Sequence, residues 1–338
     1  MKIGVAYYDS RLLKHVRADL DDMVAHGCTY VVHCLSETDV IFYKESMRAV
    51  VAETKARGLE VWMDPWGIGN VFGGEPHRSA FVGLHPEAVQ IRSDGVRTDW
   101  ACPNQPAFHQ FVREWVDHAA DIGSDVVFWD EPHYFPAQHL GLPGVWTCRC
   151  DLCQDLFRRR FGYAMPTDQS EDVLTFRQDA LTNLLGIGFA RAKERGLNNA
   201  LCPLPTDNPN RSFRDWDATA DIPGLDIFGT DPYWTGKAID TAEYVGRVTR
   251  EVVALCRARG LEDHIWIQAF EIPTGGEFEV RRAIEAAAAN GASNIAAWGY
   301  LGCAGMSTAS CGRPELVWEM MGEAFRRLHA GEPVAGSR

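Results

Sequence analysis

The sequence lacks the features that would assign it to a membrane or to nucleic acid. It contains no run of about 18 or more apolar residues, the length that a membrane-spanning helix needs. Residues 1–6 run straight into a strand-like segment, with no apolar core of a signal peptide before it. Lys and Arg number 33 against 46 Asp and Glu, and the net charge is -13. Because phosphate binding needs clustered cations, we expect a cytoplasmic protein with neither a membrane nor a nucleic-acid partner.

Nucleotide-binding signatures are also missing, since no GxGxxG follows a strand-like run and no GxxxxGK[ST] occurs. Short apolar segments instead alternate with amphipathic stretches along the whole chain. The expected strands are residues 3–8, 30–35, 60–65, 125–130, 199–204, 225–230, 265–270 and 294–300. The expected helices are residues 12–26, 46–57, 107–122, 174–195, 242–259, 280–290 and 314–329.

Strand–helix alternation predicts a parallel sheet of the α/β class, and eight repeats favour a closed (β/α)8 TIM barrel over an open sheet. We expect residues 1–329 to form one such domain and residues 330–338 to be a flexible tail. Two connections, residues 66–106 and 131–172, are far longer than a typical βα loop. They follow the third and fourth strands, so they belong to the face where barrel active sites form.

Two apolar strands end abruptly in a glutamate. Glu131 follows the fourth strand, directly after Asp130, and Glu271 follows the seventh. Such a charge can simply mark the point where a strand meets water. Two glutamates on one barrel face are nevertheless the pair that glycoside hydrolysis needs, and a retaining enzyme would hold their carboxyls about 5–5.5 Å apart.

Further side chains at the same strand ends suit a sugar. Trp66, Tyr233 and Trp298 could stack on the apolar face of a ring, and Asp64, Asp130, His133 and Asp231 could bind hydroxyl groups. A lone histidine such as His133 is more often structural than functional.

Ten cysteines are many for a chain expected in a reducing compartment. Cys148, Cys150 and Cys153 form a CxCxxC, a spacing that suits zinc and, less well, an iron–sulfur cluster. A closed zinc site needs a fourth ligand, and Cys102, His133, His139 and the other cysteines all qualify by type.

These motifs resemble two known groups of proteins. Glutamates after strands four and seven are typical of the retaining barrel glycosidases, a likeness that implies Glu131 as acid/base and Glu271 as nucleophile. The segment from Cys102 to Pro106 (CPNQP), followed by the CxCxxC, resembles the zinc site of glycoside hydrolase family 42, bacterial β-galactosidases with a catalytic (β/α)8 barrel. That resemblance implies a structural Zn²⁺ on Cys102, Cys148, Cys150 and Cys153, which would clamp the two long loops without touching substrate.

The sequence departs from family 42 at two positions. Asp130 stands where the family has an Asn that donates a hydrogen bond to the sugar 2-hydroxyl, and Thr98 stands where it has Arg, with Arg97 beside it. The chain is also about half the usual length, and a homo-oligomer stays open.

We therefore expect a retaining glycosidase acting on a β-linked glycoside or oligosaccharide, β-galactosides included. One alternative is a carbohydrate-binding barrel that has lost activity, which Asp130 motivates. Another is a metal-dependent hydrolase with Asp64, His133 and Asp231 as ligands.

Overall fold

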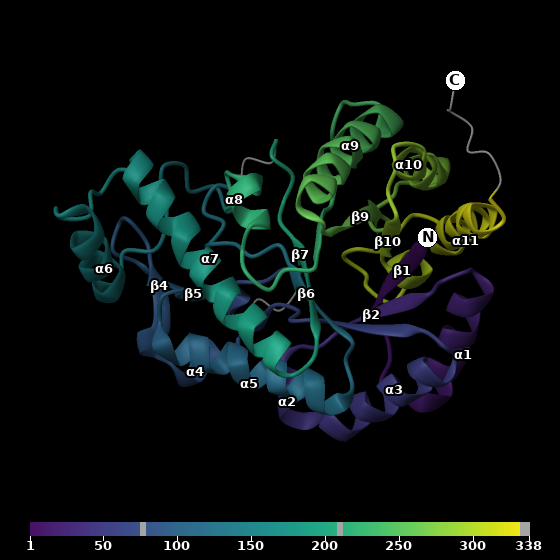
Figure 1. Cartoon of the computed structure of the whole chain (residues 1–338), viewed down its shortest axis with the longest axis horizontal. Coiled ribbons are helices and arrows are strands. Elements are labelled where there is room, and N and C mark those ends of the chain that lie inside the picture. The colour runs from purple at the N-terminus through teal and green to yellow at the C-terminus, as the bar shows by residue number, and fades with distance from the viewer. Residues whose placement is uncertain (75–78, 208–211, 332–338) are drawn as a thin grey trace.

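The structure, a computed structural model, describes residues 1–74, 79–207 and 212–331. Its centre is a closed barrel of parallel strands in the order β1-β10-β9-β8-β7-β6-β3-β2, which confirms the predicted TIM barrel (Figure 1). The barrel strands are β1 (Lys2–Tyr7), β2 (Tyr30–Cys34), β3 (Glu60–Asp64), β6 (Val126–Asp130), β7 (Asn198–Cys202), β8 (Ile227–Thr230), β9 (Glu262–Gln268) and β10 (Asn294–Trp298). Each of the eight expected strands overlaps one of them.

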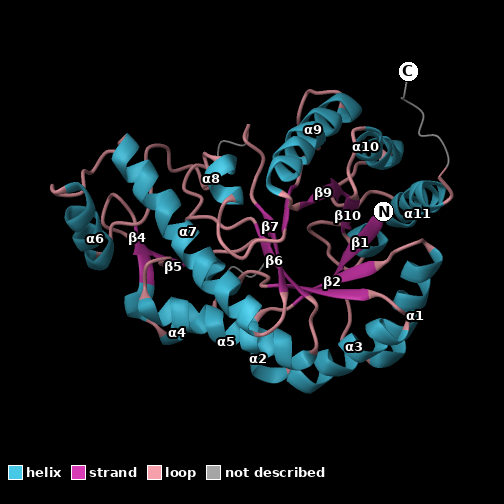
Figure 2. Cartoon of the chain, viewed as in Figure 1, coloured by secondary structure: helices cyan, strands magenta, loops and turns pink. Residues whose placement is uncertain are grey.

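Helices surround this barrel on the outside (Figure 2). The seven expected helices are present as α1 (Leu13–Ala25), α3 (Lys44–Ala56), α5 (Pro106–Ile122), α7 (Glu171–Glu194), α9 (Thr241–Arg259), α10 (Glu277–Ala289) and α11 (Pro314–His329). Four shorter helices were not predicted: α2 (Glu37–Phe42), α4 (Ala80–Leu84), α6 (Asp151–Phe161) and α8 (Trp216–Ala220). Of the expected tail, residues 330–338, residues 332–338 lie outside the part of the chain that the structure describes.

The two long connections carry structure of their own. The one after β3 contains α4 and an antiparallel pair, β4 (Val89–Ile91) and β5 (Arg97–Ala101). The one after β6 contains α6, which begins directly after Cys150. Backbone hydrogen bonds join the two connections, from Arg149 N to Ile91 O and from Ser93 N to Trp146 O, both 2.8 Å. The connections therefore form one subassembly beside the barrel, on the left of Figure 1.

The barrel interior is filled by large side chains. Tyr30, Trp62, Phe128 and Trp266 are buried there, and Tyr30 stacks on Trp62 with ring centroids 4.4 Å apart. The Tyr30 hydroxyl donates to Asn294 Oδ1 at 2.7 Å, so its polar end is satisfied. Layers of packed side chains make this barrel a core with no pore, which leaves only its rim for a binding site.

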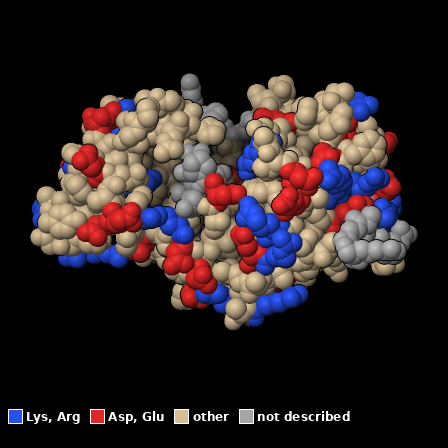
Figure 3. Space-filling view, turned by 90° about the horizontal axis from the view of Figure 1, so that it is seen from above, with Lys and Arg blue, Asp and Glu red and all other residues tan. Residues whose placement is uncertain are grey.

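Charged residues of both signs are interspersed over the outer surface (Figure 3). Many link neighbouring helices: Arg191 of α7 reaches Asp117 of α5 at 2.7 Å, and Arg282 of α10 reaches Asp240 at the start of α9 at 3.0 Å. Such exposed pairs contribute at most about 1 kcal/mol each. None of the described helices is both long and apolar enough to cross a membrane.

Candidate active site

Glu131 and Glu271 stand at the carboxyl ends of β6 and β9. Both have a left-handed backbone, with φ of 35° and 52°, which non-glycine residues rarely adopt. A backbone hydrogen bond fixes each residue: Glu131 N donates to Cys202 O, and Glu271 N donates to Ala309 O, both at 2.8 Å. Strain of this kind costs about 1–3 kcal/mol and is concentrated at functional sites, where the surroundings enforce it.

Both glutamates line the same two adjoining cavities at the barrel mouth. The cavities measure about 410 and 250 Å³ and share four wall residues: Glu131, Tyr233, Phe270 and Glu271. Together they fall within the range of small-molecule sites, roughly 300–1,000 Å³. A ligand occupying both would lie beside both glutamates.

The predicted binding residues divide between these cavities. His133 and Asp231 line the larger one, and Trp66, Asp130 and Trp298 line the smaller one. Tyr233 borders both. Asp64 lines neither: it is fully buried at the end of β3, where Cys34 Sγ lies 3.6 Å from its Oδ2.

Some wall residues were not predicted from the sequence. Phe270 could have been found, since it precedes Glu271 as Asp130 precedes Glu131. Met306, Thr308 and Ala309 come from the loop after β10 and carry no recognisable motif. Lys237, which borders the larger cavity, looks like an ordinary surface lysine in the sequence.

The carboxyl groups around Glu131 are poorly solvated. Burial raises the pKa of Asp130 and of Asp231 well above the usual range, and the nearby charge of Glu131 raises both further. Burial also raises the pKa of Asp64, with a smaller contribution from Glu131. Without a ligand, these groups are therefore inclined to hold protons, and a protonated Asp130 can donate a hydrogen bond as an Asn would.

His133 takes a structural role as well as a place in the wall. Its Nδ1 lies 2.6 Å from the carbonyl oxygen of Glu131, which fixes the ring beside the strand end. Among the described residues, Asp64, His133 and Asp231 do not come together as a group able to hold a metal ion. The geometry therefore gives no support to a catalytic metal on these three side chains.

The four predicted zinc ligands do come together. Cys102, Cys148, Cys150 and Cys153 are buried, and their sulfur atoms all lie within 4.8 Å of one another. Cys102 Sγ is 3.8 Å from Cys150 Sγ and 3.4 Å from Cys153 Sγ. Tetrahedral ligands about 2.3 Å from a zinc ion would lie about 3.8 Å apart, so the cluster is close to that geometry.

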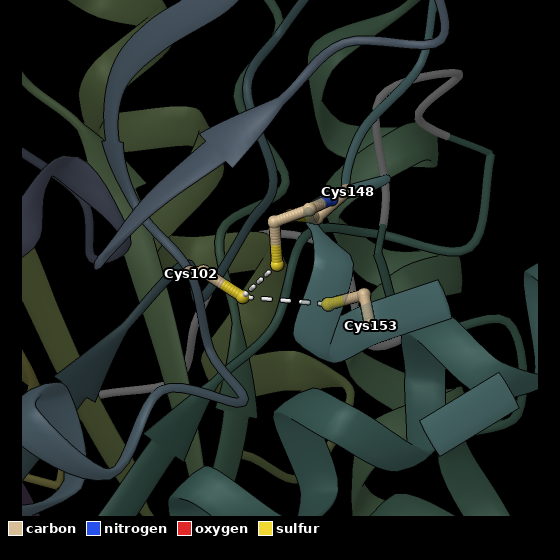
Figure 4. A group of neighbouring side chains, drawn as sticks. Cys102, Cys148 and Cys153 are labelled. Carbon is tan, nitrogen blue, oxygen red and sulfur yellow. Dashed lines mark hydrogen bonds between the residues drawn. The ribbon is translucent and has the colours of Figure 1, made fainter. Parts of the chain in front are cut away.

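The surroundings of the cysteines also suit a metal. Figure 4 shows that the side chains converge from the chain after β5, from the loop before α6 and from α6 itself. Asn104 Nδ2 donates to Cys153 Sγ at 3.3 Å, and Cys150 N donates to Cys148 Sγ at 3.5 Å. Such N–H donors orient and stabilise metal-bound thiolates.

Thr98 and Arg97, the positions at which the sequence departs from family 42 before Cys102, lie away from Glu131 and Glu271. Both lie in β5: the Thr98 hydroxyl donates to Gln90 O at 3.0 Å, and Arg97 borders a separate cavity beside Cys150. Neither lines the cavities that hold Glu131 and Glu271.

Comparison with known proteins finds similarity in structure alone. No family model and no curated protein sequence matches the chain. Two structures of Gan42B, a GH42 β-galactosidase from G. stearothermophilus, superpose with TM-score 0.68 at 12% and 13% identity, covering 98% of this chain and 57% of theirs. The chain thus spans little more than half the length of these proteins.

Two shorter barrels are also similar. GH5_18 from Streptomyces cattleya, solved in complex with GlcNAc, gives TM-score 0.62 at 14% identity over 98% of this chain and 81% of that one. The endo-1,4-β-mannanase from Rhizomucor miehei gives 0.61 at 9% identity, over 96% and 95%. At these identities the comparisons establish the barrel fold.

Proposed function

We propose that this protein is a glycoside hydrolase that acts with retention on a β-linked glycoside or oligosaccharide, with β-galactosides among the candidates. The observation that carries the proposal is the pair Glu131 and Glu271, each with a left-handed backbone and each lining both cavities at the barrel mouth. The structurally similar barrels named as a β-galactosidase and a mannanase support the same class of reaction.

In the proposed mechanism, the sugar ring lies between the two carboxyl groups. Glu131 protonates the glycosidic oxygen while the carboxylate of Glu271 attacks the anomeric carbon, forming a glycosyl-enzyme and releasing the leaving group. Glu131 then removes a proton from water, which attacks the same carbon and restores Glu271. Two inversions leave the configuration of that carbon unchanged.

The test is a panel of 4-nitrophenyl β-glycosides assayed with the wild type, Glu131→Gln and Glu271→Gln. We expect Glu131→Gln to lower kcat by about 10²–10⁴-fold, the contribution of a general acid/base, with a smaller loss when the leaving group is strongly acidic. Glu271→Gln should leave no measurable turnover. Unchanged turnover in Glu271→Gln would disprove the nucleophile assignment, and an inverted first product in proton NMR would disprove retention.

A second candidate is a sugar-binding barrel without activity. It applies if Asp130 is ionised when the sugar binds, because an ionised carboxylate cannot donate to a sugar hydroxyl. Calorimetry that detects binding of a sugar, together with no turnover of any glycoside in the panel, would decide for it.

We further propose that Cys102, Cys148, Cys150 and Cys153 hold a structural zinc ion. The four thiolates would supply all its ligands, so the metal would brace the subassembly of the two connections and take no part in hydrolysis.

A further inference from the structure

The smaller cavity has an unbalanced charge. Its described wall contains three carboxyl groups, those of Asp130, Glu131 and Glu271, and no Lys, Arg or His. The remaining wall is aromatic or uncharged. Two carboxyl groups are sufficient for the proposed hydrolysis, so the third, on Asp130, needs another explanation.

The Asp130 carboxyl occupies a space in this wall that a side chain at residue 73 would otherwise fill. The Asp130 side chain is partly buried and makes no hydrogen bond or ion pair with any described residue. Gly73 lies against it: a Cβ at that position would come within 2.2 Å of Asp130 Oδ2. The absence of a side chain at residue 73 is therefore what lets the Asp130 carboxyl occupy its place.

The protein behind Asp130 adds further carboxyl groups, and no described cation acts as their counterion. Asp64 has no exposed surface, its Oδ1 has no hydrogen-bond partner among the described residues, and its charge acts directly on Asp130. Asp231, 3% exposed, lies beside Glu131. Buried carboxylates without a partner are costly, and a cation within about 4–6 Å favours their ionised form.

We propose that the sugar in the smaller cavity carries an ammonium group at C2, so that the substrate is a 2-amino-2-deoxy-β-glycoside, bound through an ion pair with Asp130. The proposal rests on the proposed function. It selects C2 because Asp130 and Glu131 line the same cavity and Glu131 must reach the oxygen on C1. Of the two ring atoms next to C1, the ring oxygen and C2, only C2 carries a substituent. The ammonium group relieves the repulsion among the carboxylates, which an uncharged sugar cannot do.

The experiment compares kcat/KM for 4-nitrophenyl β-D-glucosaminide and β-D-galactosaminide with the corresponding glucoside, galactoside and N-acetylated glycosides. We expect the wild type to prefer a free amine by about 10- to 150-fold, the range of a hydrogen bond between charged groups. Asp130→Asn, which keeps the shape of the side chain, should abolish that preference by lowering kcat/KM for the amine alone. Asp94→Asn, a change of equal charge on the distant β4–β5 turn, should keep it.

Equal rates on amino and neutral sugars in the wild type would overturn the proposal, since a protonated Asp130 would then be serving a hydroxyl group. An amine preference that survives in Asp130→Asn would overturn it as well. If no glycoside is hydrolysed, the proposed function fails separately, and calorimetry with D-glucosamine and D-glucose on the wild type and Asp130→Asn still decides. Tighter binding of glucosamine that is lost in Asp130→Asn supports the ion pair, and equal binding of the two sugars refutes it.

Discussion

Replacing Cys102 by Ser tests the metal site, because this residue is the cysteine that the chain after β5 contributes to the cluster. Cys102 and Cys150 are 48 residues apart in sequence, and a bound ion closes the chain between them. The chain-entropy relation for a cross-link of that length gives about 4 kcal/mol. At about 2.1 cal/mol/K of unfolding entropy per residue, a 338-residue chain changes its Tm by about 1.4 °C per kcal/mol. We therefore expect Cys102→Ser to melt about 6 °C lower.

The assay is thermal unfolding combined with metal analysis of the purified protein. The wild type should contain one zinc per chain and lose about the same 6 °C when a strong chelator removes it, whereas Cys102→Ser should contain little zinc and respond little to chelator. Cys256→Ser is the matched control, because Cys256 is equally buried but donates to Phe228 O, away from the cluster. If Cys102→Ser kept a full equivalent of zinc and melted with the control, the site would not be the one described.

Three further changes test the packing and charge that support the site. Gly188→Ala in α7 should destabilise the protein by about 1–3 kcal/mol, because its Cβ would lie 2.4 Å from Trp129 Cη2; Gly186→Ala, with open space around it, should be neutral or stabilising in chemical denaturation. The hydrogen bond from Arg313 lowers the pKa of the buried Glu277 to about 2. The ion pair therefore contributes its full stability above the unfolded pKa of about 4.3, and this stability is lost as the pH falls to about 2. Glu277→Gln should thus cost about 1.5–3 kcal/mol at pH 7, and the difference from wild type should vanish near pH 2. Trp66→Ala should raise KM about tenfold with kcat less affected, since its ring forms part of the sugar-facing wall; an unchanged KM would place the sugar elsewhere.

The barrel could be predicted because each strand is a short apolar run with a helical period after it. Strand β7 also follows this rule, although it contains the polar Asn199. This side chain can be buried because its amide forms hydrogen bonds with Trp129, Phe189 and Gly224. The short helices α2 and α8 were missed because five or six residues hold too little of a helical period to recognise. Only their capping residues, Ser36 and Asp215, indicate them.

The site was partly predictable for a related reason. Strand ends are marked in the sequence, so Glu131 and Glu271 could be named in advance, whereas the charge balance around them depends on distances between strands. Asp64 illustrates this limit: it ends β3 as Asp130 ends β6, yet the one is fully buried and the other faces a cavity. The loop after β10 contributes through its backbone position, which its residue types do not reveal.

One buried side chain connects the cysteine cluster to the larger cavity. Gln90, in β4, has no exposed surface; its Nε2 donates to Ala101 O at 2.9 Å, directly before Cys102. Its Oε1 accepts hydrogen bonds from Phe135 N and from the Thr147 hydroxyl, directly before Cys148. The segment 132–147, which Gln90 holds in this way, supplies wall residues of the larger cavity, including Tyr134 and His139, and none of those of the smaller one.

A change at Gln90 should therefore affect the two cavities differently. If disaccharides bind across both cavities, as proposed, Gln90→Ala should raise their KM by about tenfold or more. The change leaves the amide of Phe135 and the hydroxyl of Thr147 without their buried acceptor. The kcat/KM of aryl monosaccharides with small leaving groups should change little. Gln90→Glu keeps an acceptor oxygen but loses the donor to Ala101 O, so it should lower disaccharide activity as well. An equal loss on both kinds of substrate would mean that the subassembly supports the whole barrel mouth, and that the segment 132–147 has no separate part in binding the leaving group.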